Sequence, residues 1–213
     1  DTASDREFFR RLLCWQPPPK VEVGLTAPER FRRLFQDRFL WNPPVASWHG
    51  APSLSLLQLP ITLPVAPDPA VPRALPGQAM RLGLVWSDGQ GRGVPLNAFA
   101  ELASLEGLEF HSLQLGPAAL QARWPPPGMR LRDWSQRLPD WAATAEVLQQ
   151  LDLLIAVDSA VACLARGLGR PCWLLGRPPF KWGRLKKEFA TRSPSSPVLF
   201  STVLEDPCSN SCP

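Results

Sequence analysis

The chain has 213 residues, of which 45% are apolar and 20% charged, as in ordinary globular proteins, so its composition excludes a disordered or fibrous chain. Its 26 prolines and 14 glycines stay below the combined share of roughly 25–30% that marks low-complexity chains. The net charge of +4 comes from 19 arginines and 4 lysines. This charge favours an anionic partner without identifying one, and a GC-rich genome that prefers arginine codons explains it equally well.

Short apolar runs alternate along the chain with amphipathic stretches. The runs that we predict to be strands are 21–25, 81–86, 110–115, 153–157, 172–175 and 198–200. The stretches that we predict to be helices are 5–13, 27–39, 96–105, 141–151 and 159–168. Runs that are apolar throughout, such as LLIAV at 153–157, suit a parallel sheet covered by helices on both faces. The pattern therefore predicts an α/β fold.

Prolines recur every few residues between about positions 43 and 76, where helical periodicity disappears. We interpret this segment as a junction. Residues 1–76 then form a reduced N-terminal half with the junction, residues 77–205 form a domain long enough for a doubly wound sheet, and residues 206–213 form a flexible tail.

The chain ends and cysteines give weaker indications. The first residues have neither an initiator Met nor the apolar core of a signal peptide, so we expect the numbering to begin inside a longer product. No apolar run reaches the roughly 18 residues that a membrane-spanning helix needs. Five scattered cysteines without a C-x-x-C pair favour a reduced, cytoplasmic compartment, although a disulfide or metal in the terminal CSNSC stays an alternative to a flexible tail.

The most informative stretch is LDLLIAVDSAVACLARGLGRPCWLL at 151–175. An apolar strand leads into Asp158 and Ser159, and the helix that follows is ended by Gly169 and Pro171. In such βαβ units ligands lie beyond the carboxyl ends of the strands, near the free N–H groups and positive dipole of the helix N-terminus. We therefore predict that Asp158 and Ser159 lie at a ligand site, with simple capping of the helix as the equally weighted alternative.

A glycine-rich loop, SDGQGRG at 87–93, follows another predicted strand. Its glycines, Gly89 among them, let the backbone approach a ligand closely, and the Arg92 guanidinium can bind phosphate oxygens. The spacing matches neither G-x-G-x-x-G nor a Walker A loop, which disfavours nicotinamide dinucleotides and P-loop chemistry. The loop therefore suits a diphosphate, and a plain flexible turn is the alternative.

Three stretches together carry a family resemblance: RLGLVWSDGQGRGVPLNAFAEL, FHSLQLGP and DWAATAEVLQQLDLLIAVDSAVACLARGLGRPCWLL. In this order they resemble the C-terminal, nucleotide-sugar-binding half of heptosyltransferase-like (family 9) glycosyltransferases, and most of all the bacterial versions attached to tetratricopeptide repeats. The upstream stretch WHGAPSLSLLQLPITLP is similar to the family's junction segment. The resemblance implies a GT-B fold, in which two Rossmann-like halves face each other and the C-terminal half holds the donor.

The resemblance also implies a function: a metal-independent, inverting glycosyltransferase, hexosyl- or heptosyltransferase-like, that uses a nucleotide-diphosphate sugar without a cofactor and a glycan or protein acceptor. The family's catalytic base is an Asp in a Gly-Asp-Thr-like turn near the N-terminus, which Asp1 and Thr2 match in part. The implied donor-side residues are Ser87, Arg92, Gln114, Gly116, Thr144, Asp158, Ser159 and Ala160.

Several positions depart from the family pattern. The family's His in its DTAVAH segment is Cys163, a Gly three residues later is Arg166, and an Asp is Ala143. A thiol is a poorer donor to phosphate than imidazole, so we expect weaker binding of the donor. Arg166 either restores positive charge at this place or, as the favoured alternative, is an exposed side chain. A catalytically inactive, glycosyltransferase-like binding or scaffolding domain is therefore the alternative function.

Other chemistries have less support. The chain contains no D-x-D pair and no Cys/His cluster, so no metal site is predicted. We expect no nucleic-acid partner. The basic run at 181–188 leaves peripheral contact with a membrane surface open.

Overall fold

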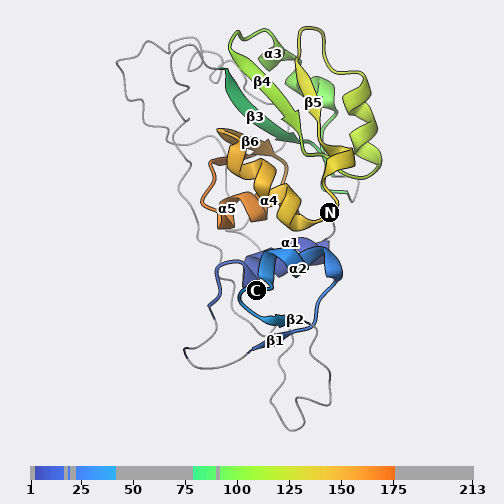
Figure 1. Cartoon of the computed structure of the whole chain (residues 1–213). Coiled ribbons are helices and arrows are strands. Elements are labelled where there is room, and N and C mark those ends of the chain that lie inside the picture. Colours follow the sequence, from blue (N-terminus) through green and yellow to red (C-terminus); the bar gives the residue numbers. More distant parts are fainter. Residues whose placement is uncertain (1–2, 17–18, 20–22, 42–78, 90–91, 176–213) are drawn as a thin grey trace, which may run out of the picture.

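The computed structural model describes residues 3–16, 19, 23–41, 79–89 and 92–175 (Figure 1). Several predictions fall outside these residues: the candidate base Asp1, the whole proline-rich junction, the strand at 198–200, the basic run at 181–188 and the tail. Within the described residues, no helix has the length and apolar character needed to cross a bilayer.

A five-stranded parallel sheet forms the centre of the larger part of the molecule (Figure 1). Its spatial order is β5-β4-β3-β6-β7. The chain thus builds outward from β3 to one edge and then returns to the other side of β3 to form β6 and β7, which is the order of a Rossmann-like sheet. The strands are β3 (Met80–Val85), β4 (Leu108–Ser112), β5 (Leu131–Asp133), β6 (Leu153–Ala156) and β7 (Cys172–Leu174). The predicted α/β fold with a parallel sheet is confirmed.

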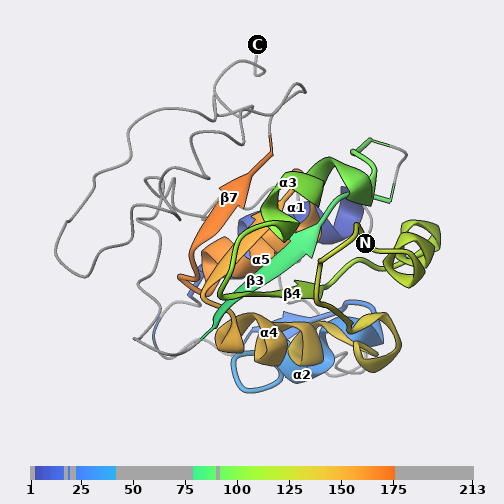
Figure 2. The same ribbon diagram turned by 90° about the horizontal axis from the view of Figure 1, so that it is seen from above.

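Helices cover both faces of this sheet because its central strands are apolar on both sides (Figure 2). Leu82 and Leu84 of β3 pack with Phe99 on one face, whereas Val85 belongs to the core of the other face together with Leu148. The elements on the first face are η4 (Leu96–Phe99) and α3 (Ala100–Ala103), and those on the second are α4 (Trp141–Gln150) and α5 (Ala160–Gly167).

The N-terminal elements pack on the outer side of α4 and α5 and extend the second core (Figure 1). Aromatic rings form much of this contact. Phe9 lies edge-on to Trp141 with ring centroids 4.9 Å apart, and its ring is also 5.4 Å from that of Phe31. The elements are α1 (Ala3–Leu12), β1 (Gly24–Leu25), η1 (Glu29–Phe31), α2 (Arg32–Phe35) and β2 (Leu40–Trp41), with β1 and β2 parallel.

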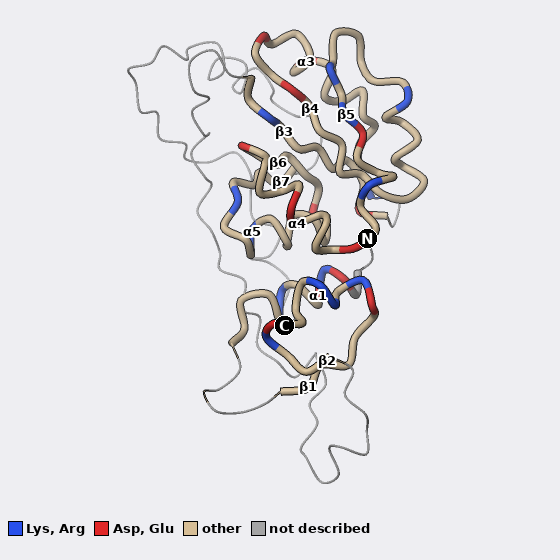
Figure 3. Tube along the Cα trace, in the orientation of Figure 1, with Lys and Arg blue, Asp and Glu red and all other residues tan. Residues whose placement is uncertain are grey.

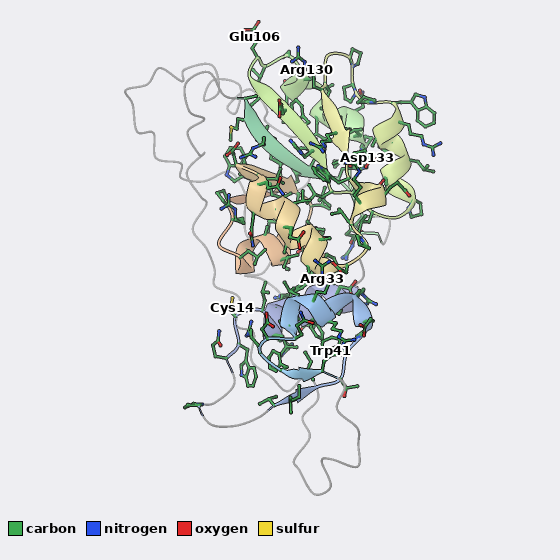
Figure 4. The ribbon with its side chains drawn as sticks, in the orientation of Figure 1. Cys14, Arg33, Trp41, Glu106, Arg130 and Asp133 are labelled. Atoms are coloured by element: carbon green, nitrogen blue, oxygen red, sulfur yellow. The ribbon has the colours of Figure 1, made fainter. Side chains whose placement is uncertain are left out.

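Ion pairs add to the contact between these parts. Arg33 on α2 lies between α2 and α4, and its guanidinium donates to the carboxylates of Asp140 and Glu146 at 2.9 and 2.8 Å (Figure 4). Positive charge is concentrated on the N-terminal elements (Figure 3), but much of it is paired locally. Arg30, for example, bonds to the buried Asp5.

Two predicted elements differ from the structure in informative ways. The helix expected at 27–39 is reduced to η1 and the single turn α2, after which the chain enters β2. The strand expected at 110–115 runs instead over Leu108–Ser112. Residues 113–115 therefore lie beyond the end of β4. The side chain of Gln114 bonds to the backbone of the residues that directly follow β3.

Candidate functional site

The two segments singled out in the sequence lie on the same edge of the sheet. β3 and β6 are parallel neighbours, and Val157, directly after β6, donates its N–H to the carbonyl of Val85, the last residue of β3, at 2.9 Å. The described residues of the loop at 87–93 (87–89 and 92–93), here called the β3 loop, and the turn Asp158–Ser159, here called the β6 turn, therefore leave adjacent strands at their carboxyl ends. The strand order reverses between β3 and β6, which is where open α/β sheets bind ligands.

The base of the β3 loop is a narrow hairpin. Ser87 and Gly93 form an antiparallel bridge, and the Val94 N–H donates to the Trp86 carbonyl at 2.9 Å. A Cβ atom on Gly93 would lie 2.3 Å from the Trp86 oxygen, so only glycine fits there. Gly89 has a φ of 78°, which also favours glycine. The glycines therefore shape the loop, whatever it binds.

The predicted phosphate-binding arginine is held by a carboxylate of its own loop. The Arg92 Nε donates to Asp88 Oδ2 at 2.7 Å, and the Arg92 backbone N–H donates to Asp88 Oδ1 at 3.1 Å. The Asp88 side chain is 7% exposed, whereas that of Arg92 is 64% exposed. Asp88 therefore orients Arg92 and offsets part of its charge, while the guanidinium stays accessible to a ligand.

Ser159 and Asp158 of the β6 turn have different roles. The Ser159 Oγ accepts from the Ala162 N–H at 3.3 Å and caps α5, and Ser159 is only 2% exposed. The Asp158 side chain is 45% exposed and does not cap the helix. Its Oδ2 instead accepts from Arg6 of α1 at 2.6 Å. Capping of α5 alone thus explains the presence of Ser159 but not that of Asp158. Ala160, the first residue of α5, is buried.

Arg6 was not among the residues predicted from the sequence. α1 and α5 lie side by side and run in the same direction, since Arg6 meets Asp158 before the start of α5 and Cys14 Sγ contacts the Gly167 carbonyl at its end, at 3.9 Å. The start of α1 therefore lies at the same edge of the sheet as the β6 turn. The arginine-rich helix was visible in the sequence, but no spacing rule links two residues 152 positions apart.

Gln114 and Gly116 lie in the connection that follows β4. Gln114 is 1% exposed, and within the described residues its amide group bonds only to backbone atoms, those of Trp86, Ser87 and Leu115. Gly116 is exposed and has a φ of 73°. Gln114 thus contacts the base of the β3 loop directly.

Thr144 and Cys163 lie on helices and have little exposure. The Thr144 Oγ1 donates to the Asp140 carbonyl one turn earlier in α4, at 3.1 Å. Cys163 is part of the core under α5, and burial raises the pKa of its thiol to about 12, with a smaller contribution from Asp158. Its thiol is therefore neutral at physiological pH and is a weak hydrogen-bond donor.

In the part of the chain that the structure describes, no three His, Cys, Asp or Glu side chains gather in a way that could hold a metal ion. No family model matches the chain, and neither does any curated protein or solved structure.

Proposed function

We propose that the chain binds a nucleotide-diphosphate sugar at the carboxyl edge between β3 and β6 and transfers the sugar to a glycan or protein acceptor. The observation that carries this proposal is the adjacency of the β3 loop and the β6 turn at the point where the strand order reverses. The motif resemblance, which covers both segments, supports the same ligand class.

The groups at this edge suit the diphosphate. Arg92 supplies an exposed, permanently charged guanidinium from one side. The N-terminus of α5 supplies the positive end of the helix dipole from the other. The buried Ser159 accepts from the Ala162 N–H, so its part in the site is to cap α5 and orient the helix N-terminus.

The proposed reaction is a single displacement with inversion. The acceptor hydroxyl attacks the anomeric carbon, the bond from that carbon to the diphosphate oxygen breaks, and the nucleoside diphosphate leaves with the electron pair. Arg92 and the α5 N-terminus stabilise the charge that develops on the leaving group, which is the role that a metal has in other transferases. A carboxylate takes the proton of the hydroxyl, and the resemblance assigns that role to Asp1.

Binding without catalysis is the second candidate. Two observations favour it: Asp158 is already paired with Arg6, and Cys163 places a buried neutral thiol where the family has an imidazole. In this case the same edge binds the nucleotide sugar, and the chain acts as a binding or scaffolding domain.

Calorimetry against UDP-, ADP- and GDP-sugars tests the donor binding that both candidates share, and CMP-sugars, which carry a single phosphate, show whether the diphosphate is needed. We expect Arg92→Ala to weaken binding by about tenfold or more, since a charge-assisted contact is lost. Arg130→Ala is the matched control, because Arg130 is exposed and precedes β5 at the opposite edge of the sheet. Absence of binding at millimolar concentration would contradict both candidates.

Product analysis then separates the two candidates. Incubation of a bound nucleotide-diphosphate sugar with a panel of glycan acceptors should release nucleoside diphosphate if the chain is a transferase. Binding without any release would favour the second candidate.

A further inference from the structure

Gln114 is a buried side chain whose hydrogen-bonding capacity is fully used. Its Oε1 accepts from the backbone N–H groups of Trp86 and Ser87, at 2.9 and 2.8 Å. Its Nε2 donates to the carbonyls of Ser87 and Leu115, at 3.1 and 3.0 Å. A primary amide offers two acceptor positions and two hydrogens, so nothing in this side chain remains for a ligand.

The backbone that carries Gln114 is itself anchored to the sheet. The Leu113 N–H donates to the Leu84 carbonyl of β3 at 3.1 Å, and the Gln114 N–H donates to the buried Ser112 Oγ at 3.4 Å. The side chain therefore reaches from a fixed point after β4 to the two residues at which the β3 loop begins. Three of its four bonds go to Trp86 and Ser87.

We propose that Gln114 is a positioning residue that fixes the β3 loop, and with it Arg92, in the geometry that binds the diphosphate, without touching the ligand itself. This inference rests on the proposed function. Gly89 of the β3 loop has no side chain, which leaves its backbone free to adopt many conformations, among them the φ of 78° found here. The bonds from Gln114 to both the N–H and the carbonyl of Ser87 fix the start of the loop, two residues before Gly89. Binding of the diphosphate then costs less conformational entropy in the loop.

The amide is the only neutral group of this size that can make all four bonds. Methionine fills a similar volume but makes none of them. An ionised glutamate accepts from Trp86 and Ser87 but places negative charge beside the Ser87 and Leu115 carbonyls, whereas a protonated glutamate can donate to one of them. Gln114→Glu should therefore restore the loop in acid, and burial raises the pKa of such a carboxyl group.

The titratable and charged groups on the elements around this position are Asp88 and Arg92 of the β3 loop, Asp158 of the β6 turn, and His111 of β4, whose Nδ1 accepts from the Trp134 Nε1–H. Asp88 and Arg92 of the β3 loop bond to each other, and Asp158 of the β6 turn bonds to Arg6. In the wild-type protein position 114 does not titrate. Any change of its amide exchange or affinity over the same pH range therefore comes from other groups and is the baseline for the variants.

The test combines amide hydrogen exchange at Trp86 and Ser87 with nucleotide-sugar calorimetry, at about pH 8 and about pH 5.5, with exchange corrected for its intrinsic pH dependence. Gln114→Met should speed exchange and weaken binding by about tenfold or more at both pH values. Gln114→Glu should behave like Gln114→Met at the higher pH and regain most of both properties at the lower one. The matched control is Gln121→Glu, because the exposed Gln121 uses only its Oε1, which accepts from the Leu96 N–H at 2.7 Å.

Three results would overturn the proposal. Unchanged exchange in folded Gln114→Met would show that the bonds do not fix the loop, and faster exchange with unchanged affinity would show that the loop geometry does not matter for the ligand. If neither variant folds at either of the two pH values, Gln114 is needed for the whole fold and is not specific to the loop. Failure of the proposed function looks different: wild type itself then binds no nucleotide sugar, while the exchange data still show whether Gln114 fixes the loop.

Discussion

The β3 loop and the β6 turn leave neighbouring strands at the same edge, but they are held in different ways. Gln114 fixes the base of the β3 loop from within the sheet, because its buried amide bonds only to backbone atoms. The β6 turn is held by the Ser159 cap and, from outside the sheet, by Arg6 of α1. One side of the proposed site therefore depends on the sheet alone, and the other depends on the N-terminal elements being in place.

The two arrangements should also differ in strength. Hydrogen bonds of a buried amide are costly to break, since the groups left behind lose their partners without gaining water. The Arg6–Asp158 pair has side chains 20% and 45% exposed, and such pairs contribute little and are screened by salt. We therefore expect the β6 turn to be the more adjustable side of the site.

The largest expected effect is that of Phe9→Ala, which tests whether α1 belongs to the main core. Phe9 is fully buried between Phe31 and Trp141, so its truncation should lower the free energy of unfolding by about 3–5 kcal/mol. Urea denaturation measures this loss. Amide exchange should then increase more at the β6 turn than at the β3 loop, and a loss below about 1 kcal/mol would show that α1 is not part of that core.

Gly93→Ala should perturb the β3 loop and leave the β6 turn unchanged. The new Cβ would lie 2.3 Å from the Trp86 oxygen and 2.8 Å from the Ser87 Cα, so we expect a destabilisation of about 1–3 kcal/mol in urea denaturation. Gly116→Ala is the control, because its φ of 73° is unfavourable for alanine but its Cβ would meet no atom within 4 Å. Equal costs for the two variants would argue against a steric role of Gly93.

Ser159→Ala should weaken the β6 turn by removing the cap of α5. Loss of such a cap costs about 1 kcal/mol, which thermal or urea unfolding can detect. Ser104→Ala is the matched control, since the exposed Ser104 hydroxyl donates only to the Glu101 carbonyl and its loss should change stability by less than about 0.5 kcal/mol.

Arg6→Gln measures how strongly α1 holds the β6 turn. We expect a loss of about 0.2–1 kcal/mol that shrinks as salt is added. A double-mutant cycle with Asp158→Asn isolates the pair, and Arg32→Gln, which breaks the exposed pair with Glu29, is the control. A coupling of several kcal/mol would mean that the β6 turn is held as firmly as the β3 loop.

Mild acid should have the smallest effect on stability, and the group responsible lies on β4. His111 Nδ1 accepts from the Trp134 Nε1–H at 3.0 Å, and burial lowers the pKa of His111 below 6.5. The pKa of His111 is therefore lower in the folded than in the unfolded protein. The stability that the neutral, hydrogen-bonded imidazole contributes is complete above pH 6.5 and is lost as the pH falls through the folded pKa. The urea midpoint should therefore decrease in mild acid, and His111→Gln should flatten that dependence.

Much of the βαβ unit at the β6 turn could be predicted from the sequence because its signals are local. The apolar run gives β6, Ser159 caps the helix as its residue type favours, and Gly169 takes the left-handed conformation expected at a helix end, with a φ of 66°. The three-residue strand β5 was missed, since it is short, partly exposed and ends in Arg132 and Asp133. Nothing in its own sequence distinguishes it from a loop.

The sequence by itself determined the α/β class, the central strands β3 and β6, the Ser159 cap and the glycine turns, because apolar periodicity and capping act over a few neighbouring residues. Only the tertiary structure decided that β3 and β6 are neighbours, that Gln114 bonds the base of the β3 loop, and that Arg6 meets Asp158. The Gln114–Ser87 contact joins residues 27 positions apart, and the Arg6–Asp158 contact joins residues 152 positions apart. Such contacts form only when the packing of the two cores brings the elements together.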